Sequence, residues 1–150
     1  MSYSQLLYHI VFRTHSSTPA ITIAHEDMLY RYVWGIVKGK DGILYRIGGM
    51  PDHIHMLVQL PPTVAVADFV RDVKVASNIF LKEHPVEFPH FRGWGTSYCA
   101  LTYSRQEKDM IVNYIMSQKE HHKRVSFQDE LAALLQEQGI AYDKEYFLRK

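Results

Sequence analysis

The spacing of apolar residues along the chain switches between the two-residue period of strands and the longer period of helices. β-branched and aromatic residues crowd residues 3–13, whereas apolar residues return at helical spacing in residues 25–38. A short connection between the second and third expected strands favours antiparallel pairing. The pattern predicts, in order, strand, helix, strand, strand, helix, strand and helix, over residues 3–13, 25–38, 43–47, 53–60, 66–83, 96–103 and 105–123.

This order of elements is typical of a ferredoxin-like α+β fold, in which helices pack on one face of an antiparallel sheet. A further helix over residues 127–138 is expected to extend the fold at its C-terminal end. Beyond it, the aromatic side chains of Tyr142, Tyr146 and Phe147 are available to dock. No linker or internal repeat interrupts the pattern, so residues 1–150 are expected to form a single domain.

The third expected strand carries a pair of histidines, and turn-forming residues 48–52 lead into it. His53 and His55 are two positions apart, so their side chains should share one face of the sheet while Ile54 points into the core. Two imidazoles on one face can bind one divalent metal ion. The alternative is a chance spacing of two of the nine histidines on a half-buried strand. A metal site therefore needs a third ligand from elsewhere in the chain.

The third expected helix supplies a candidate for that ligand. Residues 104–107, with the sequence Ser-Arg-Gln-Glu, form a capping box at its start. Tyr114 and Gln118 are one helical turn apart, and His121 lies on the same helix face. If this helix covers the histidine face of the sheet, an amide oxygen and a phenol reach the two imidazoles. Such a site leaves coordination positions open for a phosphate oxygen.

Composition narrows the class of protein without choosing a function. Hydrophobic residues make up 47% and charged residues 22% of the chain, which is the balance of a soluble globular protein. No apolar run is long enough to span a bilayer and the N-terminus lacks signal-peptide features, so a cytoplasmic location is expected. Cys99 is the single cysteine and is interpreted as a small core residue. The net charge of +1 argues neither for nor against nucleic acid.

Any binding of nucleic acid should therefore depend on a local groove with aromatic platforms. Residues 84–95 are rich in aromatic side chains, which with Arg92 could stack unpaired bases. The alternative is that these rings pack the loop onto the sheet. Arg13 and Lys74 are further candidates for DNA contacts, although a solvated helix face explains Lys74 better.

Two motifs together resemble the single-tyrosine HUH transposases, the bacterial insertion-sequence type that moves as single-stranded DNA and includes the REP-associated tyrosine transposases. The first is residues 50–58, Met-Pro-Asp-His-Ile-His-Met-Leu-Val, and the second is Tyr114-x-x-x-Gln118 with the following His121-His122 pair. Residues 8–14 resemble the first strand of the family, and residues 127–146 resemble the C-terminal extension of one branch. Residues 14–17, Thr-His-Ser-Ser, depart from the family's more basic pattern, which would remove a phosphate contact.

The resemblance implies metal-dependent cleavage and strand transfer of single-stranded DNA at hairpin-marked ends, through a 5′-phosphotyrosine intermediate. It implies Tyr114 as the nucleophile and a Mg²⁺ or Mn²⁺ ion bound by three residues, His53, His55 and Gln118. Asp52 is expected to support a ligand, and His121 is a lesser candidate ligand that, like its neighbour, is interpreted mainly as a packing, capping or DNA-contacting residue. A homodimer is also implied, in which the Tyr114 helix of one chain can complete the site of the other.

Two other functions fit the same sequence. One is a domesticated relative that binds or nicks repeated hairpins without transposing. The other is a non-catalytic ferredoxin-like nucleic-acid binder with an incidental His-x-His pair, which would bind DNA without metal and form no covalent adduct. Tyr98 and Tyr103 are the rival nucleophiles, but they lie on a strand without a candidate ligand at helical spacing.

Overall fold

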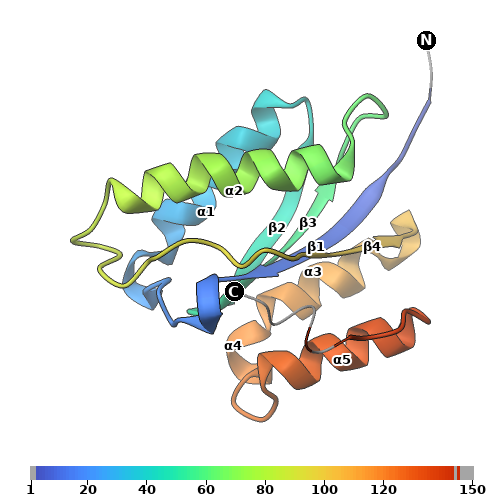
Figure 1. The fold of residues 1–150 in the computed structure, drawn as a ribbon. Coiled ribbons are helices and arrows are strands. Elements are labelled where there is room, and N and C mark those ends of the chain that lie inside the picture. The colour runs from blue at the N-terminus through green and yellow to red at the C-terminus, as the bar shows by residue number, and fades with distance from the viewer. Residues whose placement is uncertain (1–2, 144, 146–150) are drawn as a thin grey trace.

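The computed structural model describes residues 3–143 and residue 145, so Tyr146 and Phe147 lie outside the described residues. Four antiparallel strands form one sheet in the order β2-β3-β1-β4 (Figure 1). This arrangement confirms the expected α+β class and ferredoxin-like sheet. The strands are β1 (Leu7–Arg13), β2 (Ile43–Met50), β3 (His53–Gln59) and β4 (Cys99–Tyr103).

The α-helices begin and end close to the expected positions, with one exception in the third. Short 3₁₀ turns precede α1 and α3, and the capping box of Ser104 and Glu107 is present at the start of the second of these turns. None of the described helices has the length and apolar composition to cross a membrane. The helices are α1 (Glu26–Gly39), α2 (Val66–Lys82), α3 (Lys108–Met116), α4 (Gln118–His121) and α5 (Phe127–Glu137).

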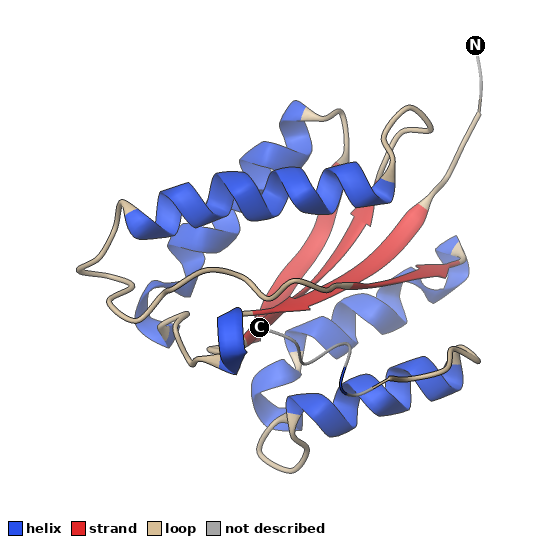
Figure 2. Cartoon of the chain, in the orientation of Figure 1, coloured by secondary structure: helices blue, strands red, loops and turns tan. Residues whose placement is uncertain are grey.

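Helices cover both faces of the sheet, whereas the sequence pattern placed them on one face (Figure 1; Figure 2). On one face, Ile10 and Ile54 pack in the core beneath α1 and α2. On the other, Leu131 of α5 packs with Val11, and α3 packs against Leu57. The physical reason is that β1 and β3 carry apolar side chains on both faces, so each face needs its own covering layer.

Two glycines, Gly48 and Gly49, allow β2 to pack closely against β3 and α3. The sequence predicted a turn from residue 48 onward, but β2 continues to Met50 and the turn narrows to residues 51–52. A Cβ atom on Gly48 would lie 3.0 Å from the backbone oxygen of Ile115, and one on Gly49 would overlap the carbonyl of His53. Glycine is therefore needed here because α3 and β3 approach the backbone closely.

The aromatic residues of the α2–β4 connection pack onto the sheet. Phe88 and Phe91 are buried in the core, and the ring of Trp94 lies 4.9 Å from that of Phe12, edge to face. These contacts favour the packing alternative for these three rings. The structural reason is that the loop must cover the end of β1, which a long polar loop could not do.

Candidate active site

β3 places His53 and His55 on the sheet face covered by α3, α4 and α5. Both side chains are 0% exposed, and their rings lie 5.2 Å apart. β3 is hydrogen-bonded to β1 on one side and β2 on the other, so the two histidines stand on an interior strand of the sheet. The shared face expected from the two-residue spacing is present, and it is buried.

His53 is held from both ring nitrogens. Its Nδ1 lies 2.7 Å from Oδ1 of Asp52, and its Nε2 lies 3.2 Å from Oε1 of Gln118. The ring also stacks on Phe127 of α5, with the ring centroids 4.2 Å apart. A carboxylate at one nitrogen fixes the tautomer and aims the other nitrogen, which is the support expected of Asp52.

His55 is held by a third histidine that sequence reasoning missed. Nε2 of His9 lies 2.8 Å from Nδ1 of His55, and the two rings are stacked. His9 sits on β1 directly beside β3, and it is fully buried. The available signal was a polar residue within an otherwise apolar strand, on the same face as Val11.

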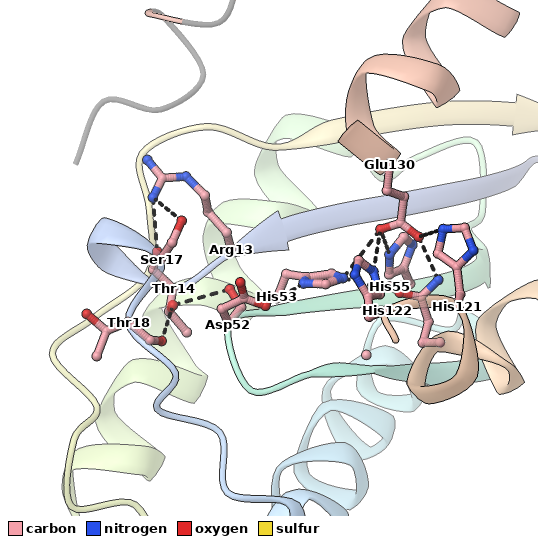
Figure 3. Close-up of polar contacts among 12 residues, drawn as sticks. Arg13, Thr14, Ser17, Thr18, Asp52, His53, His55, His121, His122 and Glu130 are labelled. Carbon is pink, nitrogen blue, oxygen red and sulfur yellow. Dashed lines mark hydrogen bonds and ion pairs between the residues drawn. The ribbon is translucent and has the colours of Figure 1, made fainter. Parts of the chain in front are cut away.

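Glu130 of α5 is the second residue that sequence reasoning missed, and it lies at the centre of the site (Figure 3). Its side chain is 1% exposed. Oε1 lies 3.0 Å from Nε2 of His55, 3.1 Å from Nε2 of His122 and 3.4 Å from Nε2 of His53. The signal for it was a charge on the apolar stripe of α5, where it follows Phe127 by one turn.

Tyr114 and Gln118 meet at the other oxygen of this carboxylate. The Tyr114 hydroxyl donates to Oε2 of Glu130, and Nε2 of Gln118 donates to the same oxygen over 2.8 Å. The ring of Tyr114 lies 5.7 Å from that of His55. The structure therefore brings the four main candidate residues into one cluster around Glu130. They are His53, His55, Tyr114 and Gln118.

The helix that carries Tyr114 and Gln118 is not continuous, in contrast to the expected helix over residues 105–123. It breaks at Ser117, which has φ −93° and ψ 13°, so that α3 ends and α4 begins there. The amino group of Lys119 ties α4 to β2 by donating to the backbone oxygen of Gly49 over 2.8 Å. His121 lies on α4 with its Nε2 3.4 Å from Oε2 of Glu130, in the half-exposed rim of the site.

Burial lowers the pKa of the two deepest imidazoles. The pKa of His55 falls to about 4, and that of His9 falls to about 3 with help from the neighbouring His55. Both rings are neutral at neutral pH and can offer a lone pair. Burial also acts to lower the pKa of His53, but hydrogen bonds and charges from Asp52 and Glu130 outweigh it and raise the pKa.

The pKa of the Glu130 carboxyl and the pKa of the Tyr114 phenol are shifted in opposite directions. Burial acts to raise the pKa of the Glu130 carboxyl, but hydrogen bonds from His122, His53 and His55 hold it well below its usual range. Burial and the hydrogen bond to Glu130 raise the pKa of Tyr114 well above its ordinary value. At neutral pH the site therefore holds a charged carboxylate beside a protonated phenol.

The donor set fits a divalent metal ion. His53, His55 and Glu130 offer ligand atoms that all lie within 4.8 Å of one another, and all three residues are buried. Imidazole nitrogens and carboxylate or amide oxygens are ligands that divalent cations accept. The Glu130 carboxylate would also offset part of the positive charge of a bound ion in this buried site.

The three candidate DNA contacts lie in different surroundings. Arg13 is 2% exposed, and its Nη1 donates to Oγ of Ser17 over 3.1 Å (Figure 3). The amino group of Lys74 donates to the backbone oxygens of Gly95 and Ser97, so it holds the loop segment that leads into β4. Arg92 is exposed on the α2–β4 connection. Of the three, Arg92 is the exposed one.

In the described part of the chain, neither rival tyrosine makes the hydrogen bond to Glu130 that Tyr114 makes. The ring of Tyr103, on β4, lies 6.2 Å from that of His9, while Tyr98 precedes β4 and is 38% exposed. Burial raises the pKa of Tyr103. Tyr114 is the tyrosine that bonds to Glu130, so the geometry favours it over both.

Comparison with known proteins places this chain in one family. The family model described as IS200-like transposase matches residues 2–118, so the chain belongs to the IS200-like transposases. It is therefore a DNA-processing enzyme of the transposase class. The matched region ends at Gln118 and does not include α5.

A relative in this family is the ISDra2 transposase TnpA of Deinococcus radiodurans. It is 37% identical over 125 residues, which cover 76% of this chain and 84% of that protein. Among solved structures, a candidate transposase from Deinococcus radiodurans R1 is 29% identical with a TM-score of 0.60, over 78% of this chain and 93% of that one. A REP-associated tyrosine transposase bound to a REP hairpin also has a TM-score of 0.60, over 83% of this chain and 73% of that one, and at 13% identity it shows likeness of fold alone.

Proposed function

We propose that this transposase cleaves and joins single-stranded DNA with Tyr114 as its nucleophile and a divalent metal ion as its cofactor. The observation that carries the proposal is the meeting of the Tyr114 phenol and the His53–His55 pair at one buried carboxylate. A nucleophile and a metal site this close can act on the same phosphate. A non-catalytic binder has no need to bury these groups together.

His53, His55 and Gln118 would hold Mg²⁺ or Mn²⁺. Asp52 supports this role because it accepts the Nδ1 hydrogen of His53 and so directs Nε2 toward Gln118 and Glu130 in the site. When bound, the ion would draw charge from a non-bridging oxygen of the scissile phosphate. His121 stands at the rim and is 32% exposed, so a contact to DNA suits it better than ligation.

Tyr114 would attack the scissile phosphorus through its phenolic oxygen. The new bond is a 5′-phosphotyrosine, the bond to the 3′ oxygen breaks, and the phenol proton is lost while the 3′ oxygen gains one. The phosphodiester energy is kept, so a later 3′-hydroxyl can reverse the step and join a different end. Because the pKa of Tyr114 is raised in this structure, the attack requires a cation near the phenol oxygen.

The substrate we propose is single-stranded DNA with hairpins at the element ends. The fold resembles that of a REP-associated tyrosine transposase bound to a REP hairpin, which supports this class of substrate. Exposed Arg92 is the proposed contact to the phosphates, with Lys74 and Arg13 shaping the loop behind it. A homodimer in the cytoplasm would let two DNA ends be held together for strand exchange.

The test is incubation of the protein with labelled single-stranded DNA from the flanks of its own gene. With Mn²⁺, a denaturing gel should show a covalent adduct between the protein and the 3′-side DNA fragment, and a released 5′-side fragment that ends in a 3′-hydroxyl. Chelation of the metal should abolish both. Binding without an adduct, unaffected by chelation, would instead identify a non-catalytic binder. Cleavage without transfer to a second labelled strand would point to a domesticated nicking enzyme.

A further inference from the structure

We infer that Glu130 is a fourth protein ligand of the metal ion, bound through Oε1, beside His53, His55 and Gln118. The inference rests on the metal site of the proposed function and extends it to α5. Glu130 reaches the site from a helix beyond residues 2–118, the part of the chain that the family model matches. Its carboxylate points into the histidine cluster in Figure 3.

The first argument is the convergence of lone pairs. Nδ1 of His53 faces the Asp52 carboxylate, so in the neutral ring Nδ1 carries the hydrogen and Nε2 carries a lone pair. That Nε2 faces Oε1 of Gln118 at 3.2 Å and Oε1 of Glu130 at 3.4 Å. When the ring is neutral, these three ligand atoms therefore lie around one position, and a cation there would be next to the negative charge of Glu130.

The second argument is spacing. Adjacent ligands on an octahedral ion with bonds of about 2.1 Å lie about 3 Å apart. Oε1 of Glu130 lies 3.0 Å from Nε2 of His55 and 3.4 Å from Nε2 of His53. The site is thus already arranged at ligand spacing, so binding an ion would need little movement of these side chains.

The third argument is charge. Two neutral imidazoles and an amide leave both positive charges of the ion uncompensated in a buried site. The negative charge of Glu130 would compensate one positive charge of the ion, and the scissile phosphate would compensate the other. Its second oxygen, Oε2, accepts hydrogen bonds from Tyr114 and from Nε2 of Gln118. One carboxylate would therefore link the ion, a ligand and the nucleophile.

The packing of α5 explains how a C-terminal helix holds a ligand in place. Phe127, Leu131 and Leu135 are buried against Val11 and the neighbouring side chains of β4. Phe127 lies one helical turn before Glu130 and Leu131 follows it directly, so the buried apolar side of α5 borders the carboxylate. Glu130 therefore reaches the proposed metal site only when α5 is packed against the sheet.

The test compares Mn²⁺ binding to the full chain and to Glu130→Gln and Glu130→Ala by calorimetry. Both substitutions should weaken Mn²⁺ binding at least about tenfold, the loss expected on removal of a ligand or its close support. Water proton relaxation separates these roles, because only loss of a ligand opens a position to water and raises relaxation per bound Mn²⁺. Glu137→Gln, an exposed glutamate on the same helix, is the matched control and should bind Mn²⁺ like the unmodified chain.

Circular dichroism would verify that each variant is folded, and Glu130→Gln carries the test alone if Glu130→Ala loses α5. Unchanged or tighter Mn²⁺ binding in folded Glu130→Gln, with binding lost in His53→Ala, would overturn this inference and leave the proposed site of three ligands standing. Unchanged binding in both Glu130→Gln and His53→Ala would overturn the proposed metal site itself. Weaker Mn²⁺ binding in both Glu130 variants, with higher water proton relaxation per bound Mn²⁺ in Glu130→Ala, would establish Glu130 as a ligand.

Discussion

The phenol of Tyr114 on α3 donates a hydrogen bond to Oε2 of Glu130 on α5. This contact joins a residue of the family-matched region to one that lies beyond it. It also sets the ring of Tyr114 5.7 Å from that of His55. The orientation of the proposed nucleophile is therefore held by the C-terminal helix as well as by its own.

Tyr114→Phe should abolish the covalent adduct while leaving the fold and Mn²⁺ binding nearly intact. The substitution removes one oxygen, and the phenylalanine ring can keep its place between His55 and His121. The measurement is adduct formation on a denaturing gel, with peptide mapping of the adduct from the unmodified protein. Tyr103→Phe is the control and should still form the adduct. Mapping of the DNA to Tyr98 or Tyr103 would refute the assignment.

Gln118→Ala should weaken Mn²⁺ binding and slow cleavage without removing the nucleophile. The substitution deletes the amide oxygen that faces Nε2 of His53 and the amide nitrogen that donates to Glu130. We expect a loss of roughly tenfold in metal affinity. Titrating Mn²⁺ in the cleavage assay checks this, because excess metal should restore adduct to Gln118→Ala and not to Tyr114→Phe. Equal rescue of both variants would contradict the separate roles.

Short-range spacing in the sequence found His53, His55, Tyr114 and Gln118 because each pair is fixed by the period of one strand or one helix. The same reasoning could not find Glu130, since its contact with His55 spans 75 positions and depends on how α5 docks. The class of fold followed from the order of elements, which local patterns determine. The covering of both sheet faces did not, because it depends on long-range packing.

The glycines before β3 show a related limit. Gly48 and Gly49 indicate a turn by local rules, yet both extend β2. Their role becomes visible only when Ile115 of α3 is placed against Gly48 and the backbone of β3 at His53 is placed against Gly49. The break at Ser117 is of the same kind, because α4 leaves the line of α3 where Lys119 bonds to Gly49.

Without metal, the protein should lose stability as the pH falls below about 6.5, the ordinary pKa of histidine. The pKa of His55 is about 4 and that of His9 about 3 in the folded chain. Between these values and 6.5 the unfolded chain binds more protons, so the free energy of unfolding decreases with falling pH. The loss from His55 alone is on the order of 3 kcal/mol. The raised pKa of His53 acts in the opposite direction and offsets part of it.

Urea unfolding in chelator, between about pH 7 and about pH 4.5, measures this dependence. His9→Gln should flatten it, because one of the two buried imidazoles is gone. His90→Gln removes an exposed histidine of the α2–β4 connection and should leave the dependence unchanged. Stability that rises as the pH falls through this range would contradict the neutral, buried state of His9 and His55.

Gly49→Ala should destabilise the protein by about 1–3 kcal/mol, the usual cost of forcing an extra methyl group into a packed interior. The new Cβ would overlap the carbonyl of His53, so the β2–β3 pairing must shift beside the proposed metal ligand. Gly35→Ala on the exposed side of α1 is the control, because nothing lies within 4 Å of its Cβ position. The control should gain about 0.5–1 kcal/mol from helix propensity. Thermal or urea unfolding of the two variants measures both effects.

Mixing Tyr114→Phe protein with His53→Ala protein tests whether a site is built within one chain or shared across a homodimer. In the structure, Tyr114 bonds to Glu130 of its own chain, beside its own His55. We therefore expect cleavage by re-formed mixed dimers to stay at background, since each chain lacks one essential group. In a shared arrangement, half of the dimers would each regain one of two sites, restoring about a quarter of the activity. Recovery of that size, with mixed dimers verified by differently tagged chains, would show that the Tyr114 helix crosses to the partner when DNA is cleaved.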